Sequence, residues 1–414
     1  MFSEVNAMLL QFRVKNYRSI GDEVVIDFTA GSGKEHSDFL IERNKVKILP
    51  VVSLYGNNAS GKSNIVEAMK TMTKSIHDSH MYGEKYGVLT MPFLYDERLS
   101  CEPSEFEVFV ALNGREYQYG FIATEHEVIE EWLYERMLSI NETKRYCIFE
   151  RDRNRTRFEK GKSTLDDASR EKLKILTDVI GKKTLALSFL ANHSETVTSV
   201  FKNICYWFGG IFSWNLDNID TNIWSSIYKE IDGATTSLNS FIRFLHEFDP
   251  HLEKIEIEEE RNKDGKIEFR ALTYHNNKKY PIEIESTGTR KLFRLYIAIY
   301  VCLNIQPSVL IYDELDSYIH PLILRRIVAM FHDKKINKTG SQLIFTAHNL
   351  IVLDNRELRR DEIWFVEKDE RGFTNAYSLD SFKTDEDKIR SDVSYGKHYL
   401  AGRFGAIPYA NQRG

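Results

Sequence analysis

Residues 56–63 carry the pattern G-x-x-x-x-G-K-S, in which glycines, a lysine and a hydroxyl stand at the spacing that phosphate chemistry needs. Glycines let backbone N–H groups curve around a phosphate, and a helix that follows presents its positive N-terminal end to the same anion. In this pattern Lys62 reaches the β- and γ-phosphates and the Ser63 hydroxyl is a ligand for Mg²⁺. We therefore expect a nucleoside triphosphate site with Mg²⁺.

The surroundings of this loop have the form that the pattern requires. The apolar run 51–55 predicts a strand before the loop, and a helical pattern follows it. The alternative is a Gly-rich turn that only connects a strand to a surface helix, and the two flanks favour the phosphate site. The expected nucleotide contacts are Gly56, Asn57, Asn58, Ala59, Ser60, Gly61, Lys62, Ser63 and Asn64.

A second motif follows the apolar run 309–312, which is typical of a strand buried on both faces. Asp313 and Glu314 come directly after it, at the carboxyl end where ligands of open α/β sheets bind. We expect Asp313 to hold Mg²⁺ through its water shell and Glu314 to orient and polarise the attacking water. Acids at this point also cap helices, so the catalytic interpretation depends on the loop upstream.

Two weaker motifs complete the set. Ser286 and Gly288 form a Ser-x-Gly turn before a long apolar helix, and such a turn binds anions through a hydroxyl, backbone N–H groups and the helix dipole. His348 ends another apolar run, where it would hydrogen-bond the γ-phosphate or the attacking water. Ser286 could be only an N-cap and His348 only structural; their order in the chain favours the nucleotide site.

Hydrophobic periodicity indicates the elements that would position these residues. The helix after the loop is expected to reach about Ser79, Asn113-Gly114 is a hairpin signal, and residues 165–247, with Trp207, Trp214 and Trp224, are mostly helical. Helices and strands alternate in the last third, as in a parallel α/β sheet. Strands are expected at 9–14, 23–28, 105–112, 117–123, 127–138, 144–150, 252–260, 266–274, 309–312 and 342–346.

Length and composition describe an ordinary globular chain. Its 414 residues suffice for two or three domains, and 28% charged residues with a net charge of −5 give no global tendency to bind nucleic acid. No apolar run approaches the roughly 18 residues that span a bilayer, so we expect no membrane association. Four widely spaced cysteines predict neither a zinc site nor a disulfide framework, and they favour the cytoplasm.

Three other patterns have plain explanations. The basic strip 151–157 lacks flanking aromatic residues, which favours a solvated hairpin over a nucleic-acid contact. His77 and His80 have no acids or cysteines nearby and are expected at a helix end. Arg326 and His332 match a loose ribonuclease spacing, but surface charge on the helix after Pro321 explains them as well.

The order of the motifs resembles that of ABC-type ATPases, with a long insertion between the phosphate-binding loop and the signature turn. The loop 56–64 resembles the G-x-N-G-x-G-K-S-N sequence of the SMC, RecF and OLD branch, with Ala59 where glycine is usual. Residues 12–20 resemble the N-[FY]-[RK]-S segment of that branch, which implies that Arg18 contacts nucleotide. A clear Q-loop glutamine is missing, since Gln118 fits an ordinary strand residue.

Bacterial AAA-family ATPases of the AbiL, RloA and PARIS AriA kind resemble the chain from end to end. The resemblance rests on Pro92-Phe93-Leu94, the strands over 106–121, the Asp-Glu-Leu-Asp run at 313–316 with His320-Pro321, and the tail 399–408. It implies an α/β fold, an ABC-type P-loop ATPase head with an inserted β-rich and helical module. The expected parts are a nucleotide-binding lobe at 1–80 and 285–380, the module at 88–284, and a C-terminal tail at 381–414.

This resemblance also implies an assembly and a role. Signature turns act on the nucleotide of a facing protomer, so Ser286 and Gly288 would complete the ATP site of another chain in a homodimer or higher homo-oligomer. The expected activity is hydrolysis of ATP to ADP and phosphate, by the sensor or scaffold ATPase of a bacterial antiphage, abortive-infection system. The stretch after His348 is too short for a Toprim domain, so the effector would be a separate Toprim-type nuclease encoded nearby. An SMC- or RecF-like DNA-binding ATPase in repair is the alternative, and nucleic acid is a possible partner in either case.

Overall fold

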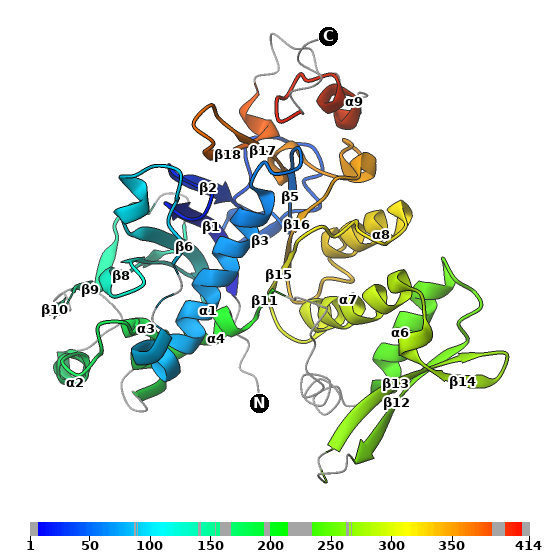
Figure 1. Ribbon diagram of the computed structural model, residues 1–414, viewed down its shortest axis with the longest axis horizontal. Helices are drawn as coiled ribbons and strands as arrows, with labels where there is room; N and C mark the ends of the chain where they lie inside the picture. Colours follow the sequence, from blue (N-terminus) through cyan, green and yellow to red (C-terminus); the bar gives the residue numbers. More distant parts are fainter. Residues whose placement is uncertain are drawn as a thin grey trace.

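The computed structural model describes residues 7–86, 88, 90–139, 142–153, 155–157, 167–193, 199–213, 234–261, 265, 267–382 and 394–407. Within these ranges a seven-stranded antiparallel sheet and a six-stranded, mainly parallel sheet lie on either side of the long helix α1 (Lys62–Tyr86) (Figure 1). The predicted α/β fold class is confirmed.

The antiparallel sheet joins the first strands of the chain to strands that follow α1. Its order is β10-β9-β8-β7-β6-β1-β2, and Phe12 on β1 lies opposite Val108 on β6. Phe12 and Val14 pack into the core shared with α1, so the alternation of a strand places Gln11 and Arg13 on the other face. The strands are β1 (Ala7–Lys15), β2 (Val24–Asp27), β6 (Ser104–Leu112), β7 (Arg115–Ala123), β8 (Val128–Met137), β9 (Tyr146–Asp152) and β10 (Arg155–Arg157).

The second sheet carries the strands that the nucleotide motifs follow. Its order is β11-β15-β16-β5-β17-β18, and every neighbouring pair is parallel except β17 with β18. The carboxyl ends of β5, β15 and β16 therefore meet at one edge. The strands are β5 (Val51–Tyr55), β11 (Ile211–Ser213), β15 (Val309–Tyr312), β16 (Gln342–Thr346), β17 (Ile363–Lys368) and β18 (Thr374–Ser378).

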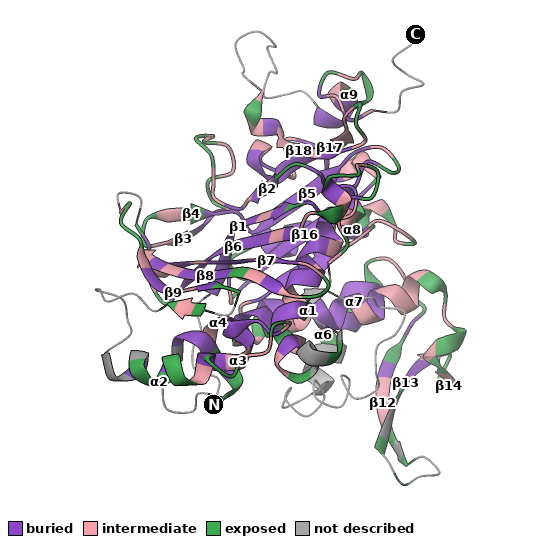
Figure 2. Ribbon diagram, turned by 60° about the vertical axis from the view of Figure 1, so that its left-hand side comes forward, coloured by how far each residue is buried: buried purple, intermediate pink, exposed green. Residues whose placement is uncertain are grey.

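Successive residues of these strands enter two different cores. On β5, Val52 and Leu54 pack with residues of α1, whereas Val51 and Tyr55 pack with residues of α7 (Thr287–Asn304) and α8 (Pro321–His332). Figure 2 shows the central strands buried along their length. A strand covered on both faces needs apolar side chains at every position, which explains the continuous apolar runs in the sequence.

Smaller elements surround this centre. A three-stranded sheet, β12-β13-β14, lies beside α6 and α7 at one end of the molecule, and α9 lies near β17 and β18 at another (Figure 1). No helix in the described part of the chain is long and apolar enough to cross a membrane. The elements are β3 (Ile41–Arg43), β4 (Val46–Ile48), α2 (Asp167–Thr177), α3 (Ala186–His193), α4 (Ser199–Gly209), α6 (Ala234–His246), β12 (Lys254–Arg261), β13 (Ile267–His275), β14 (Lys278–Pro281) and α9 (Tyr395–Leu400).

The predicted strands are present, and two local expectations are settled. Asn113 and Gly114 have φ of 50° and 78°, the left-handed conformations of a tight hairpin, so that turn is confirmed. Helix α1 continues past Ser79 to Tyr86, which makes the predicted helix end wrong and places His77 and His80 inside the helix. Trp214 and Trp224 lie outside the described residues.

The antiparallel sheet crosses the predicted boundary between lobe and module. Strands β1 and β2 belong to the expected lobe, yet they share the sheet with β6 to β10, which belong to the expected module at 88–284. Strand β11 likewise pairs with β15. The first part of the module therefore continues the sheet of the lobe, and the proposed division of the chain stays a prediction.

Candidate nucleotide-binding site

The phosphate-binding loop begins where β5 ends and closes into the first turn of α1. Ala59 has a φ of 64°, a left-handed conformation that costs less for glycine. A Cβ on Gly56 would strike the carbonyl oxygen of Val366, and a Cβ on Gly61 would strike the side chain of Thr374. Both glycines are therefore required by the close approach of β17 and β18.

Thr374, the first residue of β18, ties the loop to the N-terminal segment. Its hydroxyl lies 2.7 Å from Ser19 Oγ and donates to the carbonyl oxygen of Ser60 at 3.1 Å. Asn64 Nδ2 donates to the same Ser19 Oγ at 2.6 Å. Ser19 and Asn64 thus fix the loop between α1 and β18, which gives both positions a structural role.

Asp313 and Glu314 lie at the end of β15, and β16 separates that strand from β5. Thr346, at the end of β16, donates from Oγ1 to Asp313 Oδ1 at 2.6 Å and accepts from the backbone N–H of Glu314 at 2.7 Å. Glu314 has a φ of 52° and an exposed side chain. One hydroxyl therefore fixes both acids at the sheet edge where the loop begins.

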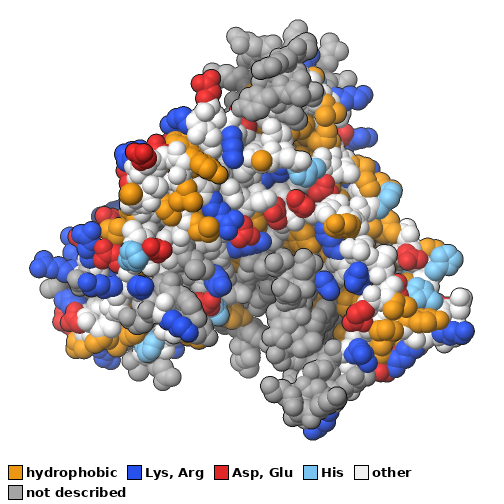
Figure 3. Space-filling model, viewed as in Figure 1, with side chains coloured by type: hydrophobic (Ala, Val, Ile, Leu, Met, Phe, Trp, Pro, Cys, Tyr) orange, Lys and Arg blue, Asp and Glu red, His pale blue; other side chains and the backbone are white. Residues whose placement is uncertain are grey.

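Lys62 is buried between the loop and these acids. Its Nζ donates to the carbonyl oxygens of Gly56 and Asn57, each at 2.9 Å. Burial lowers the pKa of the Lys62 ammonium, and the carboxylates of Asp313, Glu314 and Asp316 oppose that shift. The strand that carries Asp313 and Glu314 ends at the same sheet edge as the strand that leads into the loop. Figure 3 shows acidic and basic side chains meeting in the middle of this face of the molecule.

The residues present fit a nucleotide with Mg²⁺. The hydroxyl of Ser60 is buried and has no hydrogen-bond partner among the described residues. Ser63 and Asp313 supply a hydroxyl and a carboxylate, and Mg²⁺ at phosphate sites takes few protein ligands because phosphates and waters complete its shell. Within the described ranges no group of three His, Cys, Asp or Glu residues could hold a metal alone.

The signature turn opens α7. Ser286 is the N-cap of this helix, since its Oγ accepts from the backbone N–H of Thr289 at 3.1 Å, and its side chain is exposed. A Cβ on Gly288 would come 2.7 Å from the carbonyl oxygen of Tyr318. The turn therefore packs against the segment that follows Glu314 in the same chain, with Ser286 left open to solvent.

Lys291, one turn further along α7, strengthens that contact. Its Nζ donates to three carbonyl oxygens of the turn after β15: that of Glu314 at 3.0 Å, that of Leu315 at 3.2 Å and that of Ser317 at 2.6 Å. One ammonium group thereby holds the backbone of the turn that carries Glu314. Sequence reasoning missed Lys291, because a lysine on a helix is usually a surface residue.

His348 is exposed after β16. The backbone N–H groups of His348 and Asn349 donate to Asp316 Oδ2 at 2.9 and 2.7 Å. Asp316 belongs to the turn after Glu314, so the two strand ends are linked directly. The structure thus brings Lys62, Asp313 and Glu314 to one region and connects His348 to it through Asp316.

The comparisons with known proteins bear on this arrangement. Residues 51–178 and 196–354, which together make up more than half of the chain, match the family described as "AAA domain, putative AbiEii toxin, Type IV TA system". The chain belongs to this AAA domain family. The matched ranges contain the phosphate-binding loop, the signature turn, both acids and His348. No curated protein matches the chain in sequence.

Solved structures similar to this AAA domain protein include two SMC heads. The SMC head domain from Thermotoga maritima is 17% identical, with a TM-score of 0.41, over 89% of this chain and 98% of that one. The Smc head domain with an extended coiled coil bound to the C-terminal domain of ScpA, from Pyrococcus furiosus, is 13% identical, with a TM-score of 0.44, over 90% and 96%.

Arg18 lies outside the residues matched to the AAA domain. Its Nη2 is 3.9 Å from Glu67 Oε2 on α1, and its φ of 50° is left-handed. The neighbouring Asn16 is buried, and its side chain donates to the carbonyl oxygens of Leu99 and Glu102. The N-terminal segment therefore organises the loop before β6, and the nucleotide contact of Arg18 stays a prediction.

Two of the weaker patterns resolve into structural roles. Arg151 is buried and donates to the carbonyl oxygens of Thr184 and Gly181, while the rest of the basic strip that the structure describes follows the expected β9–β10 hairpin. His332 is also buried, 2.9 Å from Glu362 Oε1, so surface charge is the wrong explanation for it. Arg326 instead forms an ion pair with Glu247, so Arg326 and His332 do not share a site.

Proposed function

We propose that the chain is an ABC-type ATPase that binds ATP with Mg²⁺ and hydrolyses it to ADP and phosphate. The observation that carries the proposal is that the loop with Lys62 and the two acids follow β5 and β15 at the same edge of the parallel sheet, with the acids fixed by Thr346 on the intervening β16. Lys62 would neutralise the phosphates, Ser63 and Asp313 would hold Mg²⁺, and Glu314 would polarise the attacking water. His348 would hydrogen-bond the γ-phosphate.

Substituting Glu314 tests this assignment. Glu314→Gln should retain ATP binding and lose turnover by about two orders of magnitude, because the carboxylate acts on water only in the chemical step. Lys62→Ala should instead weaken nucleotide binding itself. Glu370→Gln, an exposed acid far along the chain, is the matched control. Phosphate release at the wild-type rate from purified Glu314→Gln protein would rule out the assigned role.

The proposed working unit is a dimer with composite sites. Ser286 is exposed at the N-terminus of α7, which supports contact with a phosphate held by a second copy. In such a dimer Lys62→Ala and Ser286→Arg each break both sites. A mixed dimer carries the two lesions in one site and leaves the other whole.

Mixing the two inactive variants is therefore diagnostic. Half of the dimers are mixed after free exchange and half of their sites are intact, so activity should recover to at most about one quarter of wild type when the sites are independent. Tagged pull-down verifies the exchange. Full activity of the Ser286→Arg homodimer would contradict the composite site and leave Ser286 only as a helix cap.

For the biological role, we propose a cytoplasmic sensor or scaffold ATPase of an antiphage system that acts with a separate effector nuclease. The support is the family description, which names a toxin and a toxin–antitoxin system, together with the sequence resemblance described above. The purified chain should cut neither DNA nor RNA, with or without ATP and Mg²⁺. Cleavage that persists in Glu314→Gln and follows the protein through gel filtration would refute the need for a separate effector.

A further inference from the structure

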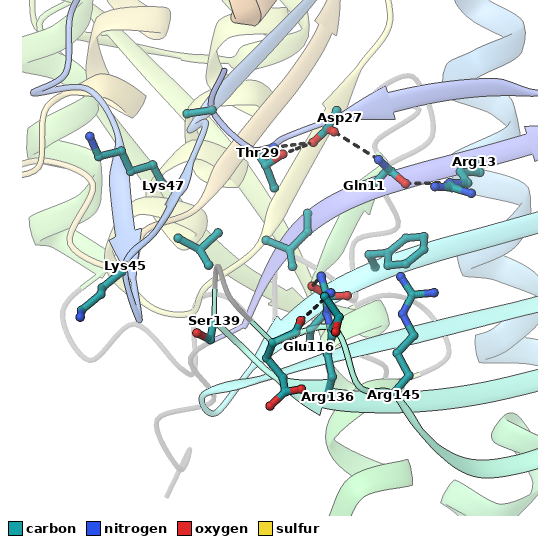
Figure 4. Close-up of a pocket in the computed structure, with 16 residues that line it drawn as sticks. Gln11, Arg13, Asp27, Thr29, Lys45, Lys47, Glu116, Arg136, Ser139 and Arg145 are labelled. Atoms are coloured by element: carbon teal, nitrogen blue, oxygen red, sulfur yellow. Dashed lines mark hydrogen bonds and ion pairs between the residues drawn. The ribbon is translucent and has the colours of Figure 1, made fainter. Parts of the chain in front are cut away.

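The outer face of the antiparallel sheet carries a cavity that the nucleotide site does not use. Its volume is about 670 Å³, within the range of small-molecule sites. It lies on the face opposite α1, where Gln11 and Arg13 point, and the β3–β4 hairpin forms its other side (Figure 4). None of the residues assigned to ATP lines it.

The cavity is lined by more cationic than acidic side chains. Its acids already accept hydrogen bonds: Asp27 from Thr29 and Gln11, and Glu116 from Arg136 at 2.6 Å. Five cationic side chains line the cavity against three acidic ones. The cationic residues are Arg13, Lys45, Lys47, Arg136 and Arg145, and the acidic residues are Asp27, Glu116 and Glu142.

Arg13 is paired with Glu107, with 3.7 Å between Nη1 and Oε2, whereas Arg145 is one of the cations of the cavity without such a pair among the described residues. Arg145 is exposed, and no carboxylate in the described part of the chain lies within ion-pair distance of it. Its guanidinium carbon is 5.5 Å from the centroid of the Phe109 ring, and that of Arg13 is 5.1 Å from the same centroid. Both guanidinium groups contact the Phe109 ring, and the planar guanidinium of Arg145 suits bidentate binding of phosphate.

We propose that this cavity binds a phosphorylated small molecule of nucleotide size, at a site separate from the ATP site. Arg145 binds the phosphate, and Arg13 on β1 adds charge at the same wall. The volume admits one nucleotide-sized ligand, and the aromatic ring fixes Arg145 without neutralising it. The proposal does not depend on the ATPase assignment.

The test uses the full chain with Lys62→Ala, which silences the phosphate-binding loop so that the two sites are measured apart. Inorganic tripolyphosphate and the four ribonucleoside 5′-monophosphates are titrated calorimetrically at near-physiological salt. We expect saturable binding of one or more probes at one site per chain. Arg145→Glu should weaken it about tenfold or more, since one charge-assisted hydrogen bond contributes that much.

Matched variants make the result specific. Lys334→Glu changes the net charge equally from an exposed position outside the cavity and should bind as the parent does. Arg13→Gln should weaken binding from a different element, which keeps the test valid if Arg145→Glu misfolds. The proposal is overturned by no saturable binding of any probe at millimolar concentration, by parental affinity in both cavity variants, or by binding of single-stranded oligonucleotides alone.

Discussion

Replacing Lys291 with methionine should slow ATP hydrolysis while leaving ATP binding nearly intact. The methionine keeps the aliphatic length but removes an ammonium that donates to the carbonyl oxygens of Glu314, Leu315 and Ser317. The hydrogen bonds of Lys291 that matter here run to the turn after β15. Lys291 acts as a positioning residue for the turn that carries Glu314.

The magnitude follows from these bonds. A hydrogen bond from a charged donor contributes about 1.5–3 kcal/mol, and three bonds to one partly exposed ammonium do not add fully. If a free energy of this size restrains the left-handed Glu314, its loss corresponds to roughly a tenfold to hundredfold lower kcat. The affinity for ATP should change less than about threefold, because the loop is untouched.

Steady-state phosphate release and equilibrium binding of a fluorescent ATP analogue separate the two effects. Lys334→Met serves as the control, since Lys334 is exposed and remote from the turn. A kcat equal to that of the wild type would refute the argument that Lys291 positions Glu314. A parallel loss of binding and turnover would show that the lysine supports the whole site instead.

Three further outcomes are expected. Ala59→Gly should raise the unfolding free energy in urea by up to about 1 kcal/mol by relieving the left-handed φ, and Ala59→Val should lower it; equal stability of both would contradict the strain. Thr374→Val should cost about 1–3 kcal/mol by the same assay, because Ser19 and Ser60 lose a buried partner, and no change would disprove that role. Glu285 raises the pKa of His275, so the stability gained over His275→Gln should be full below about pH 6.5 and fade as pH rises through the elevated value; a gain that grows with pH would reverse the assignment.

The sequence was sufficient for features with local causes. A loop of glycines between a strand and a helix, and acids at the end of an apolar strand, are recognisable in a few consecutive residues, and the structure places them at one sheet edge. The left-handed Ala59 was also foreseeable, because glycine is usual at that position of the loop. In each case the residues that the local structure requires are the same residues that form the recognisable sequence pattern.

Features that depend on distant pairing were not accessible in this way. Thr374 is an ordinary strand residue in sequence, and only the approach of β18 to the loop, more than three hundred positions away, makes it part of the site. The pairing of β1 with β6 has no local signal either, so the sheet shared by lobe and module could not be seen. The same holds for Arg145, whose neighbours come from other strands.

Lys291 also links the proposed hydrolysis to the proposed dimer. Ser286 opens α7 toward solvent, and Lys291, later in the same helix, holds the turn of Glu314 in the same chain. A phosphate held by a second copy would pull on α7 when it bound at Ser286. Helix α7 is hydrogen-bonded through Lys291 to the turn that carries Glu314 in the same chain as the helix. Engagement of one site would then change the position of Glu314 in the other, because the same short helix segment contacts both. Coupling of this kind predicts that Lys291→Met dimers hydrolyse ATP with less cooperativity than wild type, at a lower rate.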